Sequence, residues 1–142
     1  MVKNTDEGYV ANITTSFIEI PGKICSSIYF TGCAFNCQGC QNKELQKLTN
    51  GKKTTVNEIM SEIENNNLAK WVCFLGGEPF YQADFLFSLC EKISKPIGIY
   101  TGNNYNVIKN NYNEIIDLPN VKFLKTGIFD LELIKNNEFP IT

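Results

Sequence analysis

Four short runs of strand-forming residues alternate with helical patterns, and this order limits the possible folds more than any other feature of the sequence. The clearest run, residues 71–75, is apolar at every position, which is typical of a strand buried on both faces of a parallel sheet. The other runs cover residues 24–30, 96–100 and 121–124. Strand–helix alternation of this kind predicts an α/β fold with a parallel sheet and right-handed crossovers.

The segments between these runs have the apolar spacing of amphipathic helices. In the first, Thr55 and Glu58 match a capping box, the S/T-x-x-E pattern that begins a helix. Apolar residues then recur at helical spacing, as Val56, Ile59, Met60 and Ile63. The second helical pattern covers residues 85–93, with Asp84 near its start, and the third covers residues 105–112.

Three further segments have weaker patterns. Residues 9–20 alternate loosely and predict an edge strand, residues 43–48 predict a short helix or ordered loop, and the tail from Phe129 predicts a short helix. A complete eight-fold β/α barrel needs about 250 residues, whereas this chain has 142. We therefore expect one domain over residues 1–142, folded as a short open partial (β/α) barrel with a mostly parallel sheet.

Composition excludes several classes of function. The chain has no histidine, which removes Ser–His and Cys–His hydrolase mechanisms. All basic residues are lysines and the net charge is −2, which argues against a nucleic-acid partner. Residues 1–7 have no apolar segment of a secretory signal, and no apolar run approaches the roughly 20 residues that cross a bilayer. We expect a cytoplasmic protein without a membrane partner.

Three cysteines follow the first predicted strand with the spacing C-x3-C-x2-C, as Cys33, Cys37 and Cys40. Cysteine clusters in cytosolic proteins usually bind metal or do redox work, because disulfides are rare there. Iron–sulfur clusters are usually held by four thiolates, so three would leave one iron of a 4Fe–4S cluster with an open position. Open positions are typical of catalytic metal sites. We predict these three cysteines as metal ligands.

A zinc site is the alternative. Zinc takes four ligands, and without histidine the fourth would be Cys25, Cys73, Cys90 or a carboxylate. The sequence has no second paired cysteine motif, which favours the cluster. Because free cysteines are commonly buried, we expect these three further cysteines in the core.

The other predicted strands also end in unusual residues. Gly76-Gly77-Glu78-Pro79 follows the second strand, and Thr101-Gly102 and Lys125-Thr126-Gly127 follow the next two. Ligands of open α/β sheets bind at the carboxyl ends of the strands. Glycines let the backbone approach a ligand closely, and a carboxylate beside exposed carbonyls suits a cationic group such as an amine. An ordinary turn between strand and helix is the simpler interpretation of the glycine pair.

The cysteine spacing and the Gly-Gly-Glu-Pro turn together resemble the radical S-adenosylmethionine (SAM) enzymes. Within them, the chain is similar to the activating proteins of anaerobic ribonucleoside-triphosphate reductases. Three positions depart from the family pattern: Phe35 stands where histidine is usual, Gln41 where an aromatic residue is common, and Lys23 where arginine is usual. The segments that carry the resemblance are residues 21–23, 30–33, 37–42, 75–79 and 99–102.

The resemblance implies a 4Fe–4S cluster on the three cysteines, with SAM chelating the fourth iron, and a radical SAM type of barrel. One electron would cleave SAM, and the resulting radical would take hydrogen from a backbone glycine of the anaerobic ribonucleotide reductase large subunit. No separate catalytic side chain is implied. A flavodoxin- or ferredoxin-type protein would supply the electron. The implied SAM contacts are Gly76, Gly77 and Glu78 at the amino group, and Gly39, Cys40 and Gln41, of which Gly39 and Gln41 line the adenosine side.

Three other functions stay open from the sequence. The chain could activate a different glycyl-radical enzyme, or it could be a radical SAM enzyme of another kind. A zinc-stapled interaction module is the alternative without enzymatic activity.

Overall fold

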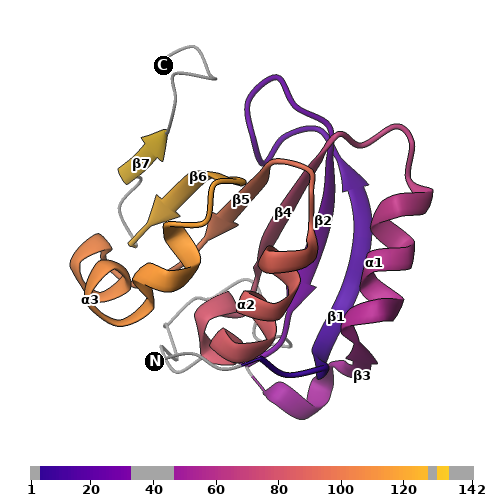
Figure 1. Cartoon of the computed structure of the whole chain (residues 1–142), viewed down its shortest axis with the longest axis horizontal. Helices are drawn as coiled ribbons and strands as arrows, with labels where there is room; N and C mark the ends of the chain where they lie inside the picture. Colours follow the sequence, from indigo (N-terminus) through magenta and orange to yellow (C-terminus); the bar gives the residue numbers. More distant parts are fainter. Residues whose placement is uncertain (1–3, 33–46, 128–130, 135–142) are drawn as a thin grey trace.

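The computed structural model describes residues 4–32, 47–127 and 131–134, which form a seven-stranded sheet with three α-helices (Figure 1). The strand order across the sheet is β3-β1-β2-β4-β5-β6-β7. Short 3-10 helices lie at Leu48–Asn50 and Pro79–Gln82. The strands are β1 (Glu7–Ser16), β2 (Cys25–Phe30), β3 (Lys52–Thr55), β4 (Trp71–Gly76), β5 (Ile97–Tyr100), β6 (Val121–Thr126) and β7 (Leu131–Ile134), and the helices are α1 (Val56–Asn65), α2 (Ala83–Lys92) and α3 (Tyr105–Ile116).

The four central strands, β2, β4, β5 and β6, run parallel to one another, which confirms the predicted α/β arrangement. Phe30 at the end of β2 pairs with Gly76 at the end of β4, and Tyr100 of β5 pairs with Lys125 of β6. The carboxyl ends of these strands therefore meet at one edge of the sheet. The outer pairs, β1 with β2, β1 with β3 and β6 with β7, are antiparallel.

Alternate side chains of the central strands enter two separate cores, because successive residues of a strand point to opposite faces. Ile28, Phe74 and Ile99 face the helices and join a large core with residues of α1, α2 and α3. Figure 1 shows α2 and α3 in front of the sheet and α1 beside β1. On the opposite face, the β1–β2 loop places Ile20 against Cys25, Trp71, Cys73 and Phe123. The helices thus cover one face, and this loop covers part of the other.

The helices begin where the sequence predicts. Thr55 accepts a hydrogen bond from the Glu58 amide, and the Glu58 side chain accepts one from the Thr55 amide, which confirms the capping box of α1. Helix α3 continues to Ile116, beyond the predicted end at Tyr112. Tyr112 itself has non-helical dihedral angles (φ −134°, ψ 29°), so the predicted end coincides with a kink.

Two of the weaker predictions are wrong. The strand predicted as an edge, β1, has β2 on one side and β3 on the other. Strand β3 pairs with the first part of β1, from Glu7 opposite Thr55 to Val10 opposite Lys52. The sequence of β3, Lys-Lys-Thr-Thr, has no apolar alternation that would reveal it. The tail forms strand β7 antiparallel to β6, in place of the predicted helix. Of the predicted element over residues 43–48, residues 43–46 lie outside the described part of the chain.

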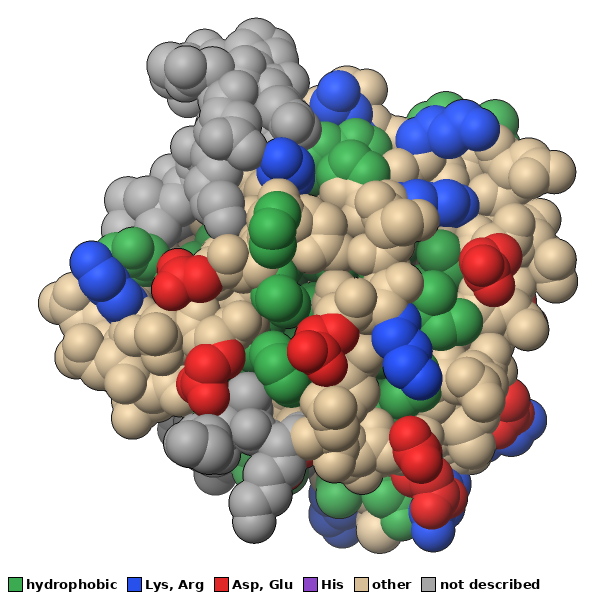
Figure 2. All heavy atoms as spheres, in the orientation of Figure 1, with side chains coloured by type: hydrophobic (Ala, Val, Ile, Leu, Met, Phe, Trp, Pro, Cys, Tyr) green, Lys and Arg blue, Asp and Glu red, His purple; other side chains and the backbone are tan. Residues whose placement is uncertain are grey.

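The helix-bearing face has a mixed surface. Figure 2 shows acidic and basic side chains interspersed over it, with apolar side chains between them. Such a surface has no large field of one sign on this face.

Candidate functional site

The predicted site residues fall into two groups. Cys33, Cys37 and Cys40, with Gly39 and Gln41, lie in residues 33–46, outside the described part of the chain. Residues 76–78, which were predicted to contact SAM, lie at the carboxyl end of β4. The described residues contain no group of three or more acidic or cysteine side chains that could hold a metal ion. The metal prediction therefore depends on the cysteine segment.

Gly32, the residue directly before segment 33–46, is hydrogen-bonded to the Gly76-Gly77-Glu78 turn. The Gly77 amide donates to the Phe30 carbonyl at 2.8 Å, and the Glu78 amide donates to the Gly32 carbonyl at 2.8 Å. Gly76 has a φ of +113°, and a Cβ there would lie 2.6 Å from the Phe30 carbonyl oxygen. Only glycine fits both this dihedral angle and this contact. The two predicted motifs are therefore brought together, up to the residue that precedes Cys33.

Leu48, two residues after the undescribed segment 33–46, is hydrogen-bonded to the residue that follows β2. The Thr31 hydroxyl, which is fully buried, donates to the Leu48 carbonyl at 2.8 Å. The Gln82 amide nitrogen donates to the carbonyls of Thr31 and Tyr9, and its oxygen accepts from the Tyr9 amide. The Gln82 side chain therefore links the backbone of β1 to the residue that follows β2, through hydrogen bonds of the kind that paired strands make. Sequence analysis missed its role, because a single glutamine in a helix-start region has no distinctive pattern.

A cavity of about 270 Å³ opens at the carboxyl ends of β4, β5 and β6. The Lys125 ammonium lies over the Tyr100 ring, 5.4 Å from its centroid. The cavity thus combines glycine backbone, one aromatic ring and one cation, which suits a ligand with both polar and apolar parts. The lining residues are Leu75, Gly76, Gly77, Tyr100, Thr101, Gly102, Lys125 and Gly127.

Glu78 turns its carboxylate into the protein, where the side chain is only 3% exposed. The Thr101 hydroxyl lies 2.9 and 2.8 Å from its two oxygens, and the amides of Gly102 and Phe80 donate to them at 2.7 and 2.9 Å. Burial raises the pKa of Glu78 above its ordinary value, and these hydrogen bonds oppose that rise. The carboxyl group of Glu78 is therefore absent from the cavity lining, although Gly76 and Gly77, directly before it, line the cavity.

The three further cysteines are fully buried with free thiols, as predicted. Burial raises the pKa of Cys25 to about 11, and it raises the pKa values of Cys73 and Cys90 as well. Cys25 and Cys73 pack in the smaller core and Cys90 in the larger one, among apolar side chains, as expected of structural cysteines.

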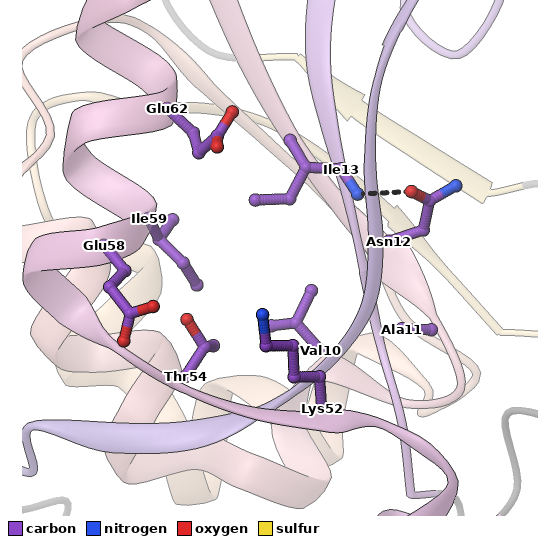
Figure 3. Close-up of a pocket in the computed structure, with 9 residues that line it drawn as sticks. All are labelled: Val10, Ala11, Asn12, Ile13, Lys52, Thr54, Glu58, Ile59 and Glu62. Carbon is purple, nitrogen blue, oxygen red and sulfur yellow. Dashed lines mark hydrogen bonds between the residues drawn. The ribbon is translucent and has the colours of Figure 1, made fainter.

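A second cavity, of about 190 Å³, lies between β1, β3 and α1 (Figure 3). Two of its polar groups already have local partners. The Ile13 amide donates to the Asn12 side chain, and the Glu58 carboxylate caps α1 through Thr55. We assign this cavity to the packing of α1 on β1.

Comparison with known proteins identifies the family. The model of the 4Fe-4S single cluster domain matches residues 19–139. The pyruvate formate-lyase-activating enzyme of Clostridium pasteurianum is 26% identical over 118 residues, covering 73% of this chain and 49% of that protein. The pyruvate formate-lyase 1-activating enzyme of Escherichia coli is 31% identical over 97 residues, covering 63% and 38%. The chain thus spans half or less of the length of these two relatives.

A third relative is closer in size. The anaerobic ribonucleoside-triphosphate reductase-activating protein of Salmonella typhimurium is 24% identical over 112 residues, covering 71% of this chain and 72% of that protein. Within the described ranges, every helix is too short or too polar to cross a membrane. Because the family model matches most of the chain, the protein belongs to the 4Fe-4S single cluster domain family, and it is similar to activating enzymes of two kinds.

Proposed function

We propose that the protein is a radical SAM activase that generates a glycyl radical on an anaerobic ribonucleotide reductase. The observation that carries this proposal is the pair of hydrogen bonds from Gly77 and Glu78 to Phe30 and Gly32. They join a glycine-lined cavity to the strand end from which the cysteine segment continues. A cofactor bound in this cavity would lie beside a metal centre held by that segment.

The site roles follow the sequence prediction. Cys33, Cys37 and Cys40 would hold the 4Fe–4S cluster, and Gly76, Gly77 and Glu78 would seat the SAM amino group. Gly39, Cys40 and Gln41 would complete the SAM site, with Gly39 and Gln41 on the adenosine side. When bound, the cluster supplies the single electron for reductive cleavage of SAM, and the protein supplies orientation and exclusion of water.

The architecture supports a single radical SAM domain over residues 1–142, with an open partial barrel. The central strands are parallel, and the three α-helices of the described residues pack on one face of them. The opposite face is partly filled by Ile20, and the cavity opens at the carboxyl edge. A large protein substrate needs such an open edge, because a loop carrying glycine must reach the bound cofactor.

The reductase is preferred as substrate because the Gly-Cys-Gln-Asn segment at residues 39–42 and the Tyr-Thr-Gly strand end at residues 100–102 resemble its activating proteins. One relative, from Salmonella typhimurium, is itself named as such a protein. The electron donor would be a flavodoxin- or ferredoxin-type protein, and the site of action the cytoplasm. Activation of pyruvate formate-lyase is the second candidate, favoured by the names and the identity of those two relatives.

The chemistry is tested by anaerobic reconstitution with iron and sulfide, followed by dithionite and SAM. We expect a brown protein that bleaches on reduction and produces 5′-deoxyadenosine. Cys37→Ala should abolish formation of 5′-deoxyadenosine. The matched control is Cys90→Ala, which changes a buried cysteine of α2 and should still form the product. A colourless zinc protein, or unchanged product from Cys37→Ala, would contradict the proposal.

The substrate is tested by adding either the anaerobic reductase or pyruvate formate-lyase to the reduced protein and SAM. We expect a glycyl-radical EPR signal with the reductase. A signal with pyruvate formate-lyase alone would transfer the proposal to the second candidate.

A further inference from the structure

Three chain segments around the 270 Å³ cavity are joined by one hydrogen-bond network. The segments are the ends of β4, β5 and β6, represented by Glu78, Thr101 and Gly127. The backbone amide and the side-chain amide of Asn103 both donate to the Thr101 hydroxyl oxygen at 3.1 Å. That hydroxyl in turn donates to Glu78. The Gly127 amide donates to the Asn103 carbonyl at 2.8 Å. The network therefore passes from β4 through β5 to β6.

The carboxylate of Glu78 is the acceptor on which this network converges. A hydroxyl and two amides, from Thr101, Gly102 and Phe80, surround its two oxygens. Leaving buried donors without an acceptor is costly. The network should therefore keep residues 76–78 and 101–103 in one relative position.

The cavity itself is lined by the backbone that this network holds. Gly76 and Gly77 precede Glu78 directly, and Thr101 and Gly102, at the end of the neighbouring strand β5, line the same cavity. A glycine-lined wall has few side chains of its own to fix its shape, so its geometry depends on hydrogen bonds behind it.

We propose that Thr101 is a positioning residue that, through the Glu78 carboxylate, holds the Gly76–Gly77 backbone in place to receive the SAM amino group. This inference rests on the proposed function and changes one of its details. Thr101 acts through Glu78, Glu78 holds the turn, and the direct contact with SAM is made by the glycine backbone.

The first test measures SAM binding and turnover for Thr101→Val, which removes the hydroxyl but keeps the shape. We expect the KM for SAM and the Kd of S-adenosylhomocysteine to rise about tenfold, the loss of roughly one hydrogen bond to a charged group. Iron content and the EPR spectrum of the reduced cluster should stay as in the wild type, and kcat should change far less than KM. Thr101→Ser, which keeps the hydroxyl, should restore both constants to within about twofold.

Ser88→Ala is the matched control, because Ser88 is a buried hydroxyl on α2 that bonds the Thr5 amide and the Asp84 carbonyl. It should leave KM unchanged. Equal KM values for Thr101→Val and the wild type, or an equal rise in Ser88→Ala, would overturn the inference. If Thr101→Val does not fold, Asn103→Ala, which removes one donor to the same hydroxyl, should still raise KM about threefold, and an unchanged KM would overturn the inference.

A double-mutant cycle separates positioning from direct contact. If Thr101 acts through Glu78, then Glu78→Gln, Thr101→Val and the double variant should have similar KM values for SAM, because coupled residues are not additive. If Glu78 binds the amino group itself, Glu78→Gln should have a much higher KM for SAM than Thr101→Val. That result would show that the inference is wrong. A wild type that fails to bind SAM would overturn the proposed function together with this inference.

Discussion

At the scale of single residues, the site depends on two positions with little tolerance for change. Gly76 combines a left-handed φ with a backbone contact, and Glu78 carries a charge into the interior. Both features cost stability in most proteins. Destabilising features of this kind are common at binding sites, because such sites require unusual local geometry. Both residues lie beside the cavity.

Gly76→Ala should lower the free energy of unfolding by about 1–3 kcal/mol, since the new Cβ meets the Phe30 carbonyl at a strained φ. Urea denaturation of the cluster-free protein measures the loss. The control is Gly22→Ala, where φ is +73° but a Cβ has nothing within 4 Å. That variant should lose about 1 kcal/mol from the dihedral angle alone. Equal losses would show that the contact with Phe30 is unimportant.

Glu78 should also give stability a pH dependence. The pKa of Glu78 is raised in the folded protein, so the unfolded chain releases this proton at lower pH. As pH rises from the ordinary glutamate pKa through the raised folded value, the folded state binds more protons, and the free energy of unfolding falls. Urea denaturation at a series of pH values should show this slope in the wild type but not in Glu78→Gln. Identical slopes would contradict a raised pKa.

At the scale of elements, lysine and asparagine side chains hold the helix ends. The Lys95 ammonium donates to the carbonyls of Ile63, Asn66 and Ala69, at 2.9, 3.1 and 2.8 Å. These carbonyls lie at the end of α1 and before β4, where helix carbonyls have no helical partner. Asn120 donates in the same way to the carbonyls of Cys90, in the last turn of α2, and Ile93, directly after the helix. The connections into the parallel strands are thus fixed by side chains.

Lys95→Met should destabilise the protein by about 1–3 kcal/mol, because it removes the charged donor from three carbonyls. The measurement is the urea midpoint at neutral pH. Lys92→Met, at the exposed last turn of α2, is the matched control and should stay within about 0.5 kcal/mol of the wild type. If both variants lose the same amount, the three hydrogen bonds contribute nothing specific.

At the scale of the whole molecule, the sheet separates two cores of different kind. The helices bury the large core, whereas the β1–β2 loop buries a smaller one through Ile20, which is fully buried. Gly98 makes room for Ile20, since a Cβ there would lie 2.4 Å from the Ile20 Cδ1 atom. The loop is also held by the Tyr100 hydroxyl, which donates to the Glu19 carbonyl. This loop therefore covers part of the helix-free face and reaches Tyr100 at the end of β5.

Ile20→Ala should lower the free energy of unfolding by about 2–5 kcal/mol, the usual cost of a cavity in a packed core. Ile18→Ala, in the same loop but with a side chain that is 88% exposed, should change it by less than about 0.5 kcal/mol. Thermal or urea denaturation distinguishes the two. A small effect at Ile20 would mean that the loop does not stabilise this face.

Local sequence was sufficient for the central elements. The apolar run of β4, the capping box of α1 and the buried cysteines were all predicted correctly, because side-chain periodicity and helix caps depend on neighbours in sequence. The glycine-rich and polar strand ends were correctly placed at one edge, because parallel strands bring their carboxyl ends together. The assignment of the three cysteines as cluster ligands stays a prediction.

The remaining features depend on contacts between distant segments. Strand β3 is polar and forms by pairing with β1, and β7 forms by pairing with β6, so neither has a reliable local pattern. Glu78 was predicted as a charge facing the ligand, but the fold surrounds it with donors from Thr101 and Gly102, which lie more than twenty residues later. Sequence alone determined which segments form the central strands and helices, because those depend on residue spacing. Tertiary structure decided which strands became edges and where the buried carboxylate points, because only packing determines which donors surround it.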